Sequence, residues 1–238
     1  MKAMLLCAGY GTRLKPWTDN HPKALAVVNN KSLLQRNIEY LASFGIKDVI
    51  INLHHFSQQI RDVVKIYNGW GSTITFSDET DAILETGGGL KRAAFFFNTE
   101  DPFVLMNVDI LTDMDIRKMT DQHTQAKPLA TIATTSRETS RYFLFDDKGI
   151  LCGWRNTKTG EEKINRVSNV YNQKAFSGIH IISPHIFSLM KQEGKFSMVD
   201  VYLNLAKTHI IKSFDHSDTK FIDVGKPESI IAAEQLFS

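Results

Sequence analysis

Short apolar runs alternate with helical patterns along the first half of the chain. Residues 3–8 form an apolar run of strand length, and residues 33–44 repeat apolar side chains at helical spacing. The same alternation predicts strands at 49–53, 73–77 and 103–107, and helices at 57–67 and after Gly89. Such an order predicts a parallel sheet, and right-handed crossovers place helices on both of its faces. The predicted fold class is therefore α/β, with a doubly wound, mostly parallel, Rossmann-like sheet.

The second half of the chain adds shorter, hairpin-like runs to this pattern. The Asp147-Lys148-Gly149 turn joins short strands expected at 142–146 and 150–154. The polar stretch 156–172 is expected to be a long loop, and such loops are often functional lids. The remaining expected elements are helices at 116–124, from Pro184 to about 190 and from Pro227, and strands at 129–135, 176–182 and 221–224. We expect a small β insertion within a single domain spanning 1–238.

Composition narrows the function classes. A chain of 238 residues with 42% hydrophobic residues is long enough to bury a core. Its 28 basic and 26 acidic residues nearly balance, so we expect no nucleic-acid or membrane partner, and any phosphate binding must be local. Cys7 and Cys152 lie in unrelated contexts that suit reduced thiols, and no stretch is long enough for a signal peptide or membrane span. These features predict a cytoplasmic protein.

A glycine-rich loop follows the first predicted strand. The carboxyl end of such a strand is where an α/β sheet places a nucleotide. Gly9 and Gly11 let backbone N–H groups approach phosphate oxygens, and Arg13 and Lys23 supply cations. A tight turn without a ligand is the usual role of an isolated glycine pair, but the hydrophilic run through Lys23 favours a phosphate pocket. The dinucleotide fingerprint, which needs a glycine at position 14, and the Walker loop both fail to match.

Two aspartates stand at the ends of predicted strands. Asn107-Val108-Asp109 ends an apolar run, and Asp223 stands near the end of the last predicted strand. Magnesium prefers one or two carboxylates together with phosphate oxygens and water. Helix capping or a turn is the commoner role of a lone aspartate. We expect Asp113 and Asp115 to be turn or supporting residues.

The run Leu6-Cys7-Ala8-Gly9-Tyr10-Gly11-Thr12-Arg13-Leu14, followed by Pro22-Lys23, resembles the signature L-A-A-G-x-G-x-R-L with P-K of the sugar nucleotidyltransferases. The resemblance implies a GT-A-like fold in which residues 1–115 bind the nucleotide and residues 116–238 bind the sugar and close the domain. It also implies that the loop grips a nucleoside triphosphate through Ala8, Gly9, Gly11, Thr12 and Arg13. Arg13 and Lys23 become the expected catalytic residues, with Lys23 also on the sugar phosphate. Asp109 and Asp223 become the expected ligands of one Mg²⁺.

The segment Glu85-Thr86-Gly87-Gly88-Gly89 is the expected site of base recognition. Consecutive glycines let the backbone lie against a flat base, although a flexible surface turn is the simpler interpretation. The resemblance implies nucleotide contacts at Glu85, Thr86, Gly87, Gly88 and Asn107. This segment is most similar to the N-acetylmuramate-1-phosphate uridylyltransferase branch.

The acceptor side departs from the family pattern. The family often carries a Glu-Lys-Pro element after the Asp-Gly hairpin, but this chain has Gly153-Trp154-Arg155-Asn156 there. The strand around Phe176-Ser177-Gly178-Ile179 resembles the family's F-x-G-I/L segment, so Gly178 is an expected sugar-phosphate residue. His180 alternates with apolar residues and is expected to be structural.

The resemblance therefore predicts transfer of a nucleotidyl group from an NTP to a sugar 1-phosphate by a monomer or small homo-oligomer. We prefer UTP and N-acetylmuramate 1-phosphate or a related hexose phosphate. The alternatives are mannose-1-phosphate guanylyltransferase, glucose-1-phosphate thymidylyltransferase and phosphocholine cytidylyltransferase. A nucleotide-sugar-binding regulatory protein is the non-enzymatic alternative, and the retained Arg13, Lys23, Asp109 and Asp223 argue against it.

Overall fold

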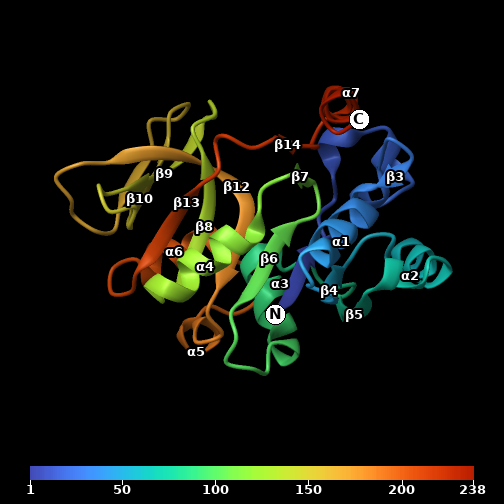
Figure 1. Ribbon diagram of the computed structural model, residues 1–238, viewed down its shortest axis with the longest axis horizontal. Helices are drawn as coiled ribbons and strands as arrows, with labels where there is room; N and C mark the ends of the chain where they lie inside the picture. The colour runs from blue at the N-terminus through green and yellow to red at the C-terminus, as the bar shows by residue number, and fades with distance from the viewer.

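The computed structural model describes residues 1–238 and is built around one large twisted sheet (Figure 1). The strand order is β11-β10-β9-β12-β6-β1-β4-β5, and β8 pairs with both β12 and β13. The strands of this sheet are β1 (Lys2–Leu6), β4 (Asp48–Leu53), β5 (Thr73–Asp78), β6 (Phe103–Asn107), β8 (Ala130–Thr135), β9 (Arg141–Phe145), β10 (Leu151–Asn156), β11 (Glu162–Ile164), β12 (Asn172–Ile182) and β13 (Ile211–Asp215). Two short ladders pair β2 (Val27–Val28) with β3 (Lys31–Ser32), and β7 (Ile110–Thr112) with β14 (Phe221–Asp223).

The centre of the sheet is parallel, as the alternating pattern predicts. Strand β1 pairs in parallel with β4 and β6, and β4 pairs in parallel with β5. The second half of the chain adds β12, which runs antiparallel to β6, β8 and β9. The antiparallel β9-β10-β11 strands continue the sheet as the expected β insertion. Strands from both halves of the chain therefore share one sheet.

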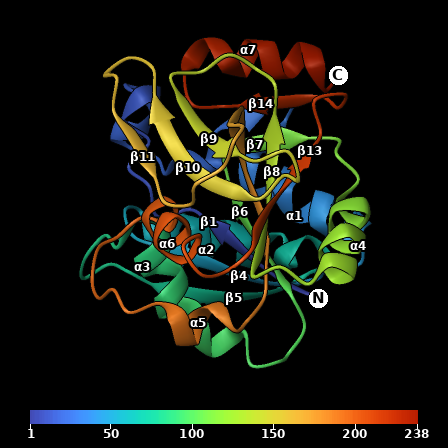
Figure 2. The ribbon, with the colours of Figure 1, turned by 90° about the vertical axis from the view of Figure 1, so that its left-hand side faces the viewer.

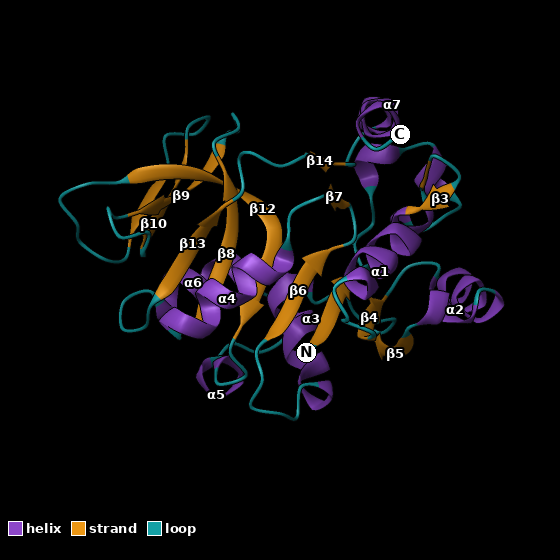
Figure 3. Ribbon diagram, viewed as in Figure 1, coloured by secondary structure: helices purple, strands orange, loops and turns teal.

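Helices cover both faces of the sheet (Figure 3). Apolar side chains of α1, α2 and α4 pack with Ala3 and Leu5 of β1 on one face, whereas those of α3, α5 and α6 pack with Met4 on the other. This alternation confirms the doubly wound α/β fold. The helices are α1 (Leu33–Ser43), α2 (Ser57–Ile66), α3 (Glu85–Arg92), α4 (Ile116–Ala126), α5 (Ile186–Leu189), α6 (Met198–Leu205) and α7 (Pro227–Leu236). None of them combines the length and apolar character that a membrane crossing needs.

Several local predictions need correction. Helix α3 begins at Glu85 rather than after Gly89, so the three glycines are helical. The stretch 156–172 is not one loop, because Glu162–Ile164 forms β11 and pairs with β10. Helix α6, strand β7 and strand β13 were not predicted. Strands of three residues, such as β7 and β11, are too short to display a periodic pattern.

The chain order creates a crevice between β1 and β6. From β1 the chain moves to β4 and β5 on one side, and then returns to place β6 on the other side of β1. Loops that leave β1 and β6 at their carboxyl ends therefore diverge, which is the usual ligand position in such sheets. The closing helix α7 lies beside β14, at the top of the view in Figure 2. It is tied back to the first half of the chain, because Asn29 Nδ2 donates to the Glu234 carbonyl at 2.9 Å.

Candidate active site

A cavity of about 420 Å³ opens at this crevice. The loop after β1, the end of β6 and the start of α3 all contribute to its lining. The lining residues are Leu6, Cys7, Ala8, Gly9, Gly11, Thr12, Arg13, Lys23, Asn52, Ile83, Glu85, Thr86, Asn107, Val108, Asp109, Ser197 and Gly225. Residues from separate parts of the chain thus meet where the sheet reverses its strand order.

At one position, the loop after β1 has a backbone conformation that favours glycine. Gly11 has φ 62°, and a Cβ there would lie 2.9 Å from Lys23 Cβ. The Gly11 carbonyl also accepts the Thr18 hydroxyl at 3.0 Å. Positive φ values favour glycine because it carries no side chain to clash. Gly11 therefore holds the loop close against Lys23.

The two expected cations reach the cavity from short 3₁₀ turns. Arg13 lies on the turn Thr12–Leu14, and its guanidinium lies 3.9 Å from Asp223 Oδ1. Gly225 makes room for it, because a Cβ there would lie 2.6 Å from a guanidinium nitrogen. Lys23 lies on the turn Lys23–Leu25, is mostly buried, and forms an ion pair with Asp109. Both cations line the cavity.

The two expected metal ligands are brought together by the β7–β14 ladder. Asp223 pairs with Ile110, and Val224 N donates to the Asp109 carbonyl at 2.8 Å. Burial raises the pKa of Asp223, and the neighbouring Asp109 carboxylate raises it further, against the effect of Lys23 and Arg13. The neighbouring Asp109 carboxylate thus adds to the negative charge around Asp223.

This pair fits a hard divalent cation. Asp223 Oδ1 is buried without a hydrogen-bond partner, which leaves a carboxylate oxygen available as a ligand. Mg²⁺ takes one or two carboxylates and completes its shell with phosphate oxygens and water. No group of three or more His, Cys, Asp or Glu side chains is clustered for metal binding. The arrangement thus suits a metal that the substrate also ligates. By contrast, Asp115 caps α4 through Arg117 N, and Asp113 accepts Lys220 N, as expected of turn residues.

Helix α3 places its glycines against a neighbouring segment rather than the cavity. Gly87 N and Gly88 N donate to the Phe196 carbonyl at 2.9 and 3.2 Å. A Cβ at Gly87 would lie 2.5 Å from the Phe196 ring, and one at Gly88 would lie 2.2 Å from the Gly194 carbonyl oxygen. These amides are engaged, so within this segment Glu85 and Thr86 are the residues that line the cavity. The glycines are required for close packing, which corrects their interpretation as a loop.

We expect Gly88→Ala to destabilise the protein. The added methyl group would press on a backbone oxygen, and overpacking of this kind costs about 1–3 kcal/mol. For a chain of this size the melting temperature should fall by roughly 3–10 °C. Thermal unfolding followed by circular dichroism measures the change. An unchanged melting temperature would mean that α3 does not pack on the 194–196 segment as described.

The expected acceptor residue Gly178 does not itself line the cavity. It has φ 73°, and a Cβ there would lie 2.9 Å from Asn107 Nδ2, so Gly178 packs on Asn107 without lining the cavity. His180 accepts or donates a 2.9 Å hydrogen bond with the buried Tyr202 hydroxyl, and burial lowers its pKa to about 3. A neutral, buried and partnered imidazole is structural, as the alternation predicts.

The sequence analysis missed several lining residues, including three that are polar or small. Asn52 is a buried polar residue near the end of β4, Ser197 caps α6, and Gly225 lies against Arg13. A polar residue near the carboxyl end of a parallel strand was the available signal for Asn52. Cys7 also lines the cavity, but burial raises the pKa of its thiol far above the usual value. Both cysteines are free, as predicted.

Known proteins are similar to this chain in sequence and in fold. The chain is 29% identical over 240 residues to a mannose-1-phosphate guanyltransferase of Yarrowia lipolytica, with all of this chain and 64% of that protein covered. The chain thus spans less than two thirds of that relative's length. The structure of HddC from Yersinia pseudotuberculosis, complexed with GMP-PN, is 26% identical with a TM-score of 0.79, covering 100% of this chain and 99% of that one.

A more distant structure shares the fold alone. UDP-glucose pyrophosphorylase from Acinetobacter baumanii is 15% identical with a TM-score of 0.80, covering 98% of this chain and 91% of that one. The profile of the nucleotidyl transferase family matches residues 2–237, which include the glycine loop, both cations and both aspartates. The chain therefore belongs to the nucleotidyl transferase family.

Proposed function

We propose that this protein transfers a nucleotidyl group from a nucleoside triphosphate to a sugar 1-phosphate, giving an NDP-sugar and pyrophosphate. One observation carries the proposal. A single cavity at the crevice of the sheet gathers the glycine loop, two cations and a carboxylate, with the second carboxylate on the adjacent β14. This combination suits a polyphosphate, because backbone N–H groups and cations meet its charge.

The chain's own residues align the substrates and neutralise their charge. An oxygen of the sugar phosphate forms a bond to the α-phosphorus, while the bond from that phosphorus to the β-phosphate's bridging oxygen breaks. Pyrophosphate leaves with the electron pair. The attacking phosphate is already an anion, so no general base is required. The loop with Arg13 holds the triphosphate and Lys23 lies at the reacting phosphates. A bound Mg²⁺, held by Asp109 and Asp223, would neutralise further charge there.

The choice of base and sugar has two candidate answers. The Glu85-Thr86-Gly87-Gly88-Gly89 segment supports our preference for UTP and N-acetylmuramate 1-phosphate. The guanyltransferase relative and the GMP-PN complex of HddC favour GTP and mannose 1-phosphate or a related sugar phosphate. Either reaction uses the same phosphate chemistry, so the candidates differ only in what surrounds the base and the sugar.

A substrate panel tests both the class of reaction and its substrates. GTP, UTP, dTTP and CTP are each combined with Mg²⁺ and with mannose, glucose or N-acetylmuramate 1-phosphate, and pyrophosphate release is recorded. We expect one pairing to exceed the others. Phosphocholine is included as the acceptor of a cytidylyltransferase. No release with any pairing, together with intact binding of an NDP-sugar, would instead identify a regulatory protein.

A further inference from the structure

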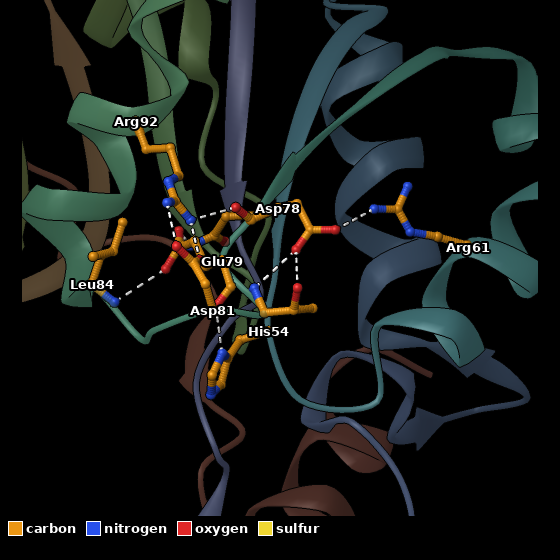
Figure 4. Close-up of polar contacts among 9 residues, drawn as sticks. His54, Arg61, Asp78, Glu79, Asp81, Leu84 and Arg92 are labelled. Atoms are coloured by element: carbon orange, nitrogen blue, oxygen red, sulfur yellow. Dashed lines mark hydrogen bonds and ion pairs between the residues drawn. The ribbon is translucent and has the colours of Figure 1, made fainter.

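The carboxyl group of Glu79 is fully buried next to the cavity, and no step of the proposed reaction uses it. Its residue has no exposed surface, and burial raises its pKa above the ordinary value. Glutamate is almost never fully buried unless polar partners compensate for its lost hydration. Figure 4 shows Glu79 between Leu84 and His54, on the segment that joins β5 to α3. The partners of this carboxyl therefore indicate what it does.

The two carboxyl oxygens accept hydrogen bonds from two segments that are distant in sequence. Asn52 Nδ2 donates to Oε1 at 2.8 Å, and Leu84 N donates to Oε2 at 3.3 Å. Asn52 in turn accepts Cys7 N at 2.7 Å and Ala8 N at 3.4 Å through its own Oδ1. One carboxyl group thus connects the start of the glycine loop with the residue that precedes α3.

The orientation of the Asn52 amide depends on Glu79. An amide has an accepting end and a donating end of similar shape, and its partners decide which way it faces. Only with Nδ2 on Glu79 does Oδ1 face the N–H groups of Cys7 and Ala8. Glutamine at position 79 would accept from only one of the two donors, Asn52 Nδ2 or Leu84 N. Its own NH₂ group, also a donor, would face the other one. A carboxyl group is therefore the side chain that this position requires.

Neighbouring residues support the same connection. The Glu79 carbonyl lies 2.6 Å from His54 Nδ1, and His54 Nε2 lies 3.2 Å from the hydroxyl of Tyr10 in the glycine loop. Gly89 leaves space for the pair, since a Cβ there would lie 2.6 Å from Glu79 Oε1 and 3.0 Å from Asn52 Nδ2. The side chain of Glu79 is thus linked to the loop through Asn52, and its backbone is linked to it through His54.

We propose that Glu79 is a positioning residue for the nucleotide, acting through Asn52 on the loop that begins at Cys7 and Ala8. The role rests on the proposed function, because the ligand of that loop is the triphosphate. A purely structural carboxyl would affect folding and leave nucleotide affinity in the folded protein unchanged. The two roles therefore predict different kinetics.

The test exchanges donor and acceptor between positions 52 and 79. Glu79→Gln leaves one donor facing an NH₂ group, and Asn52→Asp sets a carboxylate against a carboxylate. In the double variant, the new carboxylate at 52 accepts from Cys7, Ala8 and the new amide at 79, and the amide oxygen accepts from Leu84. All four hydrogen bonds are then possible again. We expect each single variant to raise the KM for GTP or UTP roughly tenfold, and the double variant to recover most of that loss.

Two measurements separate this role from general destabilisation. The KM of the sugar 1-phosphate should stay within about twofold in every variant, because its own site is not changed. Calorimetric titration with GTP or UTP and Mg²⁺ should follow the nucleotide KM. Asp81→Asn is the matched control, since Asp81 lies on the same segment but pairs with Arg92 on the surface, and it should bind nucleotide as the wild type does.

The outcomes distinguish this proposal from the proposed function. Wild-type affinity in Glu79→Gln, or a double variant no better than the single ones, would overturn the positioning role alone. Recovery of nucleotide affinity in the double variant, measured per folded molecule, supports the role. A wild-type protein that neither binds a nucleotide nor releases pyrophosphate would overturn both proposals.

Discussion

Replacing Asp223 by asparagine should reduce Mg²⁺-dependent pyrophosphate release by roughly 100-fold or more, because each lost 1.4 kcal/mol of transition-state stabilisation costs about tenfold in rate. Asp223 supplies a carboxylate oxygen without a hydrogen-bond partner beside Asp109, and an amide oxygen carries no charge to hold the metal. Asp109→Asn should have a similar effect. Initial rates of pyrophosphate release across a Mg²⁺ titration measure both variants. Two variants with wild-type rates and wild-type Mg²⁺ dependence would contradict the metal assignment.

The same substitution should have the opposite effect on stability. The pKa of Asp223 is raised in the folded protein, chiefly by burial, so its charged form is disfavoured by folding. That cost is present above the folded pKa and disappears below the ordinary pKa, where the carboxyl is neutral in both states. In EDTA at pH 7, Asp223→Asn should therefore melt above the wild type, and the difference should vanish in strong acid. A variant that melts below the wild type at pH 7 would show that Asp223 is a structural residue.

Elements with long sequence patterns were easier to predict than elements with short ones. The βαβ alternation displayed its period over long segments, and it located the carboxyl ends of β1 and β6 where the glycine loop and Asp109 lie. The proximity of Asp223 to Asp109 depends on the β7–β14 ladder, whose strands have three residues each. The sequence predicted β14 as a strand at 221–224 but not its partner β7, so only the family resemblance suggested that the two aspartates are close.

Packing explains why the glycines of α3 were misinterpreted. Three consecutive glycines disfavour a helix by about 1 kcal/mol each relative to alanine, so propensity alone predicts a loop. In the structure, Gly87, Gly88 and Gly89 are buried against Phe196, Gly194 and Glu79, where larger residues would clash. The helix is retained because tertiary contacts require glycine there. Those contacts involve residues distant in sequence, which a local pattern does not reveal.

Replacing Lys23 by methionine should lower kcat/KM for the nucleotide by roughly 100-fold or more, comparable to losing one preorganised electrostatic contact at a reacting phosphate. Methionine keeps much of the length and apolar volume of lysine, so the change removes the charge with little change in packing. It also leaves Asp109 without the cation with which it pairs. The uncompensated negative charge of Asp109 would then repel both the triphosphate and the incoming sugar phosphate.

Lys15→Met provides a matched control. Lys15 lies close by in sequence, but its side chain is exposed and pairs with Asp19 at 2.8 Å outside the cavity. Removing that charge should change kcat/KM by less than about twofold, since exposed ion pairs contribute little. If the two variants lost activity equally, the effect would reflect the general positive charge of the loop. A large loss confined to Lys23→Met, in a protein with an unchanged circular dichroism spectrum, would place Lys23 at the reacting phosphates.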